Sequence, residues 1–205
     1  MRERIAGIVG CLLLASGLCR SAELEIAIHL FDYTGMETSA SLDMRRTAAN
    51  ILDQVGISVQ WRDCPVLPGA AGSGCGAGTY DVTHFVVAVL PENMSARIAS
   101  SPQQFGKSVM GAKGGFPTHA YIFKDRVTDF ARADLLPWTS LLGAIVAHEI
   151  GHLLLGNDSH FGNGIMRGRW SLNDIKEARM GTLTFTARQG EQLRADVRRR
   201  MNAKD

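Results

Sequence analysis

Residues 148–160 read HEIGHLLLGNDSH, and this stretch decides how the rest of the chain is interpreted. On an α-helix, His148 and His152 lie one turn apart on the same face, where two imidazoles can bind one metal ion. Glu149 lies next to the first histidine and can reach a water molecule on that metal as a general base. The pattern therefore predicts a zinc ion bound by histidines of a helix, with a carboxylate beside it.

The residues before the motif make it more specific than HExxH alone. Residues 138–147 are mostly apolar and favour a helix whose N-cap is Thr139 or Ser140. A helix that is apolar all round is a buried one, and burying two histidines and Glu149 without a partner would be costly. A zinc ion would supply that partner. Two core histidines bonded to backbone carbonyls are the plainer alternative, which leaves Glu149 without a cation.

Two residues that follow the helix are candidates for the third metal ligand. Gly156 is expected to end the helix, and His160 is then offered from the turn beyond as the favoured third ligand. Three protein ligands leave the fourth position to water, as in catalytic zinc sites. Asp158 is the alternative ligand, and would leave His160 at the rim near the substrate. Glu177 is a more distant candidate, better explained as a solvated carboxylate on a short polar helix.

The stretch resembles the metzincin clan of zinc metalloproteases, whose pattern is HExxHxxGxxH followed by a turn that contains a methionine. His148, Glu149 and His152 match this pattern position for position. The chain departs from it by having three residues, not two, on each side of Gly156. Counted without a gap, the third-ligand position of the clan falls on Asp158, and some relatives, the snapalysins, use Asp there.

A candidate for the methionine turn follows directly. Residues 162–170 read GNGIMRGRW, and their glycines and asparagine are typical of a tight turn. Met166 in this turn resembles the Met-turn that lies under the metal in metzincins, although an ordinary core position is the alternative. Some relatives carry a tyrosine two residues after this methionine, where this chain has Gly168.

The N-terminus indicates export. Arg2 and Arg4 precede the apolar run 5–18, and small residues follow it, so residues 1–22 are predicted to be a secretory signal peptide. The run is too short to predict a transmembrane span. We therefore expect a secreted or periplasmic protein with one domain over residues 23–205.

Charge and composition limit the partners. The formal net charge is +2, which leaves no basic surplus for nucleic acid. We expect a peptide or protein substrate, no stable membrane association after signal removal, and a monomer. The basic residues of the C-terminal segment are interpreted as a solvated helix end whose cations suit the helix dipole. They are Arg194, Arg198, Arg199, Arg200 and Lys204.

Two cysteines follow the predicted signal peptide. Cys64 and Cys75 flank the Pro- and Gly-rich segment 65–74. In an exported protein, such a pair predicts a disulfide that closes the loop. A loop of this size gains on the order of 2–3 kcal/mol in the chain-entropy model.

Hydrophobic periodicity predicts an α/β (α+β) domain, and the resemblance to metzincins implies that its sheet is twisted and mixed. Strands are expected at 24–31, 57–61, 82–90 and 120–123, with a short edge strand at 107–111. Helices are expected at 41–55, from Thr139 through the histidine motif, and at 186–202 after a capping box that begins at Thr186. The resemblance implies a metzincin-like catalytic domain with an active-site helix, a Met-turn and a C-terminal helix, and places the substrate along an edge strand within 106–115.

Motif and resemblance together imply a secreted zinc-dependent endopeptidase. Zinc would be held by His148, His152 and His160, and Glu149 would act as general base on a zinc-activated water. Two alternatives stay open. One is an inactive binding module that keeps the zinc scaffold, and the other is a zinc hydrolase dedicated to one partner protein or to a non-peptide amide.

Overall fold

The computed structural model describes residues 23–66, 75, 81–111, 115–133, 137–158 and 160–203. The predicted signal peptide at 1–22 lies outside these residues. The described residues form five strands and six helices, which confirms the predicted mixed α/β architecture.

The five strands form one mixed sheet in the order β2-β1-β3-β5-β4. The strands β1, β2, β3 and β5 run parallel to one another, and β4 pairs antiparallel with β5 at one edge. The edge strand predicted at 107–111 is therefore present, displaced by one to two residues. The strands are β1 Leu24–Asp32, β2 Ile57–Cys64, β3 His84–Leu90, β4 Gly106–Val109 and β5 His119–Phe123.

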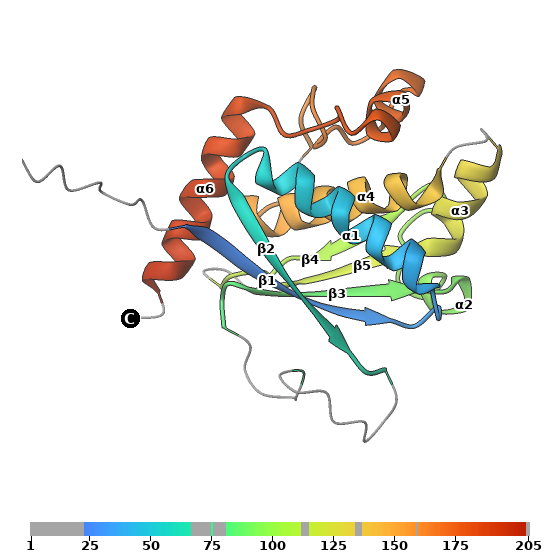
Figure 1. The fold of residues 1–205 in the computed structure, drawn as a ribbon, viewed down its shortest axis with the longest axis horizontal. Coiled ribbons are helices and arrows are strands. Elements are labelled where there is room, and N and C mark those ends of the chain that lie inside the picture. The colour runs from blue at the N-terminus through green and yellow to red at the C-terminus, as the bar shows by residue number, and fades with distance from the viewer. Residues whose placement is uncertain are drawn as a thin grey trace, which may run out of the picture.

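Six helices accompany the sheet, and Figure 1 shows α1 and α4 on the same side of it. The sequence patterns did not predict α2 or α3, because α2 is only four residues long and α3 is strongly polar. The predicted capping box at Thr186 is confirmed as the start of α6. The helices are α1 Thr38–Asp53, α2 Glu92–Ser95, α3 Lys124–Ala133, α4 Trp138–Leu155, α5 Leu172–Met180 and α6 Ala187–Asn202.

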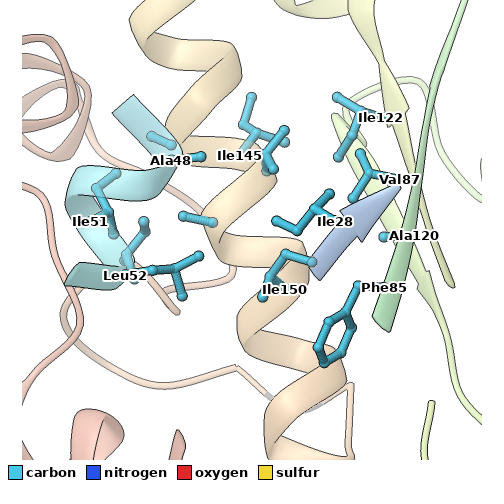
Figure 2. Packing of buried hydrophobic residues seen from close by; sticks show 14 of the residues in the cluster. Ile28, Ala48, Ile51, Leu52, Phe85, Val87, Ala120, Ile122, Ile145 and Ile150 are labelled. Carbon is cyan, nitrogen blue, oxygen red and sulfur yellow. The ribbon is translucent and has the colours of Figure 1, made fainter. Parts of the chain in front are cut away.

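The helix α4 lies at the centre of the hydrophobic core. In Figure 2, Ile145 and Ile150 of α4 lie between side chains of α1, such as Leu52, and strand side chains such as Ile28 and Phe85. By length and composition alone α4 could cross a membrane, but most of it is buried inside the protein. Its apolar character is therefore that of a core helix, as the sequence predicted.

The start of α4 differs from the prediction. Its N-cap is Pro137, with no side-chain cap hydrogen bond, so neither Thr139 nor Ser140 caps the helix. The first turn of α4 is therefore partly exposed and uncapped, and the buried part of the helix begins at Leu141. At the other end the prediction is confirmed, because Gly156 adopts a left-handed φ of 67° and its N–H bonds to the carbonyl of His152.

The C-terminal helix is not simply a solvated basic end. The side chain of Arg200 is fully buried and forms an ion pair with Asp196 at 2.5 Å. Its guanidinium also donates to the carbonyls of Val82, Pro117 and Leu153. The expectation of a solvated cluster is therefore wrong for this arginine, which joins α6 to α4 and to the start of β3.

Candidate metal centre

The helix α4 brings His148, Glu149 and His152 into the interior. All three side chains are buried, with 9%, 6% and 4% of their surfaces exposed. Two imidazoles and a carboxylate in an apolar core would be strongly destabilising without polar partners. Their polar atoms therefore need partners inside the protein.

Each histidine of the motif has one ring nitrogen held by a backbone carbonyl. His148 Nδ1 lies 2.7 Å from the carbonyl oxygen of Ile165, and His152 Nδ1 lies 3.1 Å from that of Asn157. A carbonyl oxygen can only accept, so each Nδ1 carries the proton and each Nε2 keeps its lone pair. Metal-binding histidines are oriented in this way by partners outside the metal site.

The two free lone pairs then face each other, since the Nε2 atoms of His148 and His152 are 3.1 Å apart. Burial and the neighbouring imidazole lower the pKa of His148 to about 3, and burial also lowers that of His152, so both rings are neutral. Two nitrogens bound to one tetrahedral zinc at ~2.0–2.1 Å would lie about 3.3–3.4 Å apart. The observed spacing therefore fits a shared metal ion, whereas without a cation the contact is unfavourable.

The structure brings a third imidazole to the same place. The ligand atoms of His148, His152 and His160 all lie within 4.8 Å of one another, and the three could hold a metal ion. Asp158 is exposed and is not a member of this group, although its charge acts on His152. Glu177 accepts a hydrogen bond from the side chain of Asn173 on α5 and is also not a member.

The turn that follows makes room for His160. The ring of His160 is 5.4 Å from that of His148 and 4.8 Å from that of His152, measured between centroids. A Cβ at Gly168 would lie 2.7 Å from Cγ of His160. The glycine that stands where some metzincins have tyrosine therefore leaves the space that this histidine occupies.

Met166, the methionine of the predicted Met-turn, packs against α4, the helix that carries His148 and His152. The side chain is fully buried, and a Cβ at Gly151 would approach its Sδ to 2.5 Å and Cε1 of Phe185 to 2.8 Å. Gly151 immediately precedes His152, so Met166 packs against the turn of α4 that carries His148 and His152. The backbone of the predicted Met-turn also holds His148 through the carbonyl of Ile165, which accepts from Trp170 Nε1 as well.

Glu149 is positioned by the edge strand β4, a contact that sequence reasoning missed. The Ser108 hydroxyl lies 2.7 Å from Glu149 Oε2 and 2.9 Å from the Glu149 carbonyl oxygen. A Cβ at Gly106 would lie 2.6 Å from Glu149 Oε1, so the strand backbone closes over the carboxylate. Burial raises the pKa of Glu149 to about 7, and the hydrogen bonds from Ser108 oppose that rise. Ser108 and Glu149 are 41 residues apart, so no local sequence pattern predicts their contact.

One of the three comparisons with known proteins finds a similar fold. No family model matches the chain, and no curated protein sequence matches it. Among solved structures, archaemetzincin from Methanopyrus kandleri matches with a TM-score of 0.53 at 17% sequence identity. The match covers 87% of this chain and 99% of that one. The chain therefore has an archaemetzincin-like fold.

Proposed function

We propose that this protein is a zinc-dependent peptidase that hydrolyses internal bonds of peptides or proteins. The observation that carries the proposal is the approach of two Nε2 lone pairs at 3.1 Å, in His148 and His152, beside a third imidazole and a buried carboxylate. A cation would convert this unfavourable contact into metal coordination. The archaemetzincin-like fold and the motif's resemblance to metzincins support the same proposal.

His148, His152 and His160 would hold the zinc ion, with Asp158 as the alternative to His160. When bound, zinc supplies Lewis acidity, which activates water and polarises a carbonyl group. Glu149 would accept a proton from the attacking water and return it to the leaving amine.

The free edge of β4 is the proposed place of the substrate. This strand pairs with β5 on one side, and no strand pairs with its other side among the described residues. Ser108 of this strand contacts Glu149, so an extended peptide added to the edge would pass close to the carboxylate. We further propose that the enzyme acts outside the cytoplasm, because residues 1–22 have the pattern of a signal peptide, and that it is a monomer.

Zinc content of the purified protein tests the ligand set. We expect one zinc per chain in the parent, loss of that zinc in His160→Ala, and retention in Asp158→Ala. Loss in Asp158→Ala alone would assign the third position to the aspartate. A metal-replete parent without zinc would contradict the proposed function.

Peptide hydrolysis by Glu149→Ala tests the mechanism. The variant should keep zinc, because its three imidazoles are intact, and should lose cleavage, because no group remains to take the proton. Cleavage at the parent rate would show that the mechanism is wrong. A mixture of peptides separates the remaining alternatives, since a general peptidase cuts many sites, a dedicated hydrolase few, and an inactive zinc-binding module none.

A further inference from the structure

A second cluster of metal-binding side chains lies on the other face of the sheet. Ile28 points toward α4 in Figure 2, so the next residue of β1, His29, points to the opposite face. Cys64 on β2 is paired in register with Phe31, two residues further along β1, and so lies on the same face as His29. This cluster is therefore separated from the candidate metal centre by the sheet itself.

We propose that the dithiol form of this protein binds a second metal ion, a thiophilic divalent cation of the zinc type, through His29, Cys64 and Cys75. The ligand atoms of these three residues lie within 4.8 Å of one another. Two thiolates and one imidazole are a ligand set that suits zinc, with water completing the coordination. In the structure the two cysteines are joined by a disulfide, with Cα atoms 5.5 Å apart, so the site is closed in the oxidised state.

His29 is already placed as a ligand would be. Its side chain is fully buried, and its Nδ1 lies 3.7 Å from Cys64 Sγ. Its other nitrogen, Nε2, lies 3.1 Å from Nδ1 of His84 on β3. When His29 donates its Nε2 proton to His84, its Nδ1 lone pair points at the sulfur. His84 would then be a positioning residue, as is common behind metal-bound histidines.

Opening the site is a two-electron reduction by a dithiol reductant. A thiolate of the reductant attacks Cys75 Sγ, because Cys75 is half-buried whereas Cys64 is buried. Cys64 leaves as a thiolate beside His29, and a mixed disulfide forms at Cys75. The second thiol of the reductant displaces Cys75 and ends as a disulfide. The two cysteines are released as thiols, which lose their protons when the metal ion binds.

The test counts zinc in the two redox forms of the full chain. One sample keeps the disulfide, and the other is reduced with a water-soluble phosphine that is then removed without oxygen. We expect one more zinc per chain in the reduced form. Cobalt substitution should add an intense near-ultraviolet charge-transfer band in the reduced form only, because three histidines cannot produce a thiolate band.

Variants assign the ligands. The extra zinc and the thiolate band should disappear in Cys64→Ser/Cys75→Ser and in His29→Ala, and should persist in His119→Ala, which alters an exposed histidine of the same sheet. His84→Ala should bind the extra zinc about 10- to 100-fold more weakly. Circular dichroism of each variant checks that the sheet is formed.

An equal zinc count in both redox forms of the folded protein would overturn the proposal, and so would an extra zinc that survives in His29→Ala. The outcome is independent of the proposed peptidase. If the three-histidine centre binds no zinc, the disulfide form should hold no zinc and the reduced form one, instead of one and two. The difference of one zinc between the two forms still tests the site at His29, Cys64 and Cys75.

Discussion

The ionisable side chain of Glu149 is buried in apolar surroundings. Burial raises its pKa from 4.5 to about 7, so the folded metal-free protein binds a proton more tightly than the unfolded chain does. Between pH 4.5 and about pH 7 the unfolded state holds fewer protons than the folded state, and the free energy of unfolding therefore falls as the pH rises. Above about pH 7 the full penalty is present, on the order of 3 kcal/mol.

Glu149→Gln should remove this penalty because an amide does not titrate. In chelator-treated protein, the stability of the variant relative to the parent should increase by about 2–3 kcal/mol between pH 5 and pH 8. Urea unfolding at both pH values measures the difference. Zinc should reduce the gain, because a cation offsets the carboxylate charge. A stability difference that does not change with pH would contradict this account of Glu149.

Ser108 should matter for turnover and not for metal binding. Ser108→Ala removes the hydroxyl that holds the Glu149 carboxylate, and a hydrogen bond to a charged group is worth about 1.5–3 kcal/mol. We expect kcat to fall about 10- to 100-fold with KM and zinc content nearly unchanged. Ser108→Thr should restore most of the rate, and Ser101→Ala, at an exposed serine, is the matched control. A parent-like kcat in Ser108→Ala would exclude this role.

At the scale of secondary structure, the packing of α1 on α4 depends on a glycine. A Cβ at Gly143 would lie 2.5 Å from the carbonyl oxygen of Met44 and 2.6 Å from Cβ of Thr47, so the two helix backbones approach closely there. Side-chain rearrangement cannot relieve contact with a backbone atom. The two helices must therefore separate if this position gains a side chain.

Gly143→Ala should destabilise the protein by about 1–3 kcal/mol, the range for overpacked cores. Gly162→Ala is the control, because no atom lies within 4 Å of a Cβ at that position, and its effect should stay within about 0.5 kcal/mol. Denaturant unfolding of both variants measures the contrast. Equal effects of the two substitutions would show that the helices do not need the glycine.

For the molecule as a whole, Arg200 links α6 to three other parts of the chain. Its partners are Asp196 on α6, Leu153 on α4, and the carbonyls of Val82 and Pro117 in two connecting segments. The guanidinium also lies 4.9 Å from the ring centroid of Phe85. One buried cation therefore fixes α6 against both the sheet and α4.

Arg200→Met should lower the free energy of unfolding by about 3–5 kcal/mol, because it removes the buried cation beside Asp196 and leaves the buried carboxylate only the exposed Arg199 as an ionic partner. Arg198→Met changes an exposed arginine of the same helix and should have an effect within about 0.5 kcal/mol. Asp196→Leu added to Arg200→Met should recover part of the loss. Similar unfolding curves for the two single variants would contradict the bridging role.

The sequence by itself determined what depends on local spacing. The 3.6-residue period of a helix puts His148 and His152 on one face, and short apolar or alternating runs mark the strands. Gly156 ends α4 and Thr186 begins α6 because left-handed caps and capping boxes are local chemistry. These features could be predicted because the interacting atoms are a few residues apart.

Only the tertiary structure decided what depends on contacts between distant segments. It placed His160, and not Asp158, with the other imidazoles, because Gly168 leaves room for that ring. It also set Ser108 on Glu149 and buried Arg200 among carbonyls from three segments. Such contacts are set by how strands and helices pack, and a charged or polar residue has the same local signature whether it faces solvent or a buried partner.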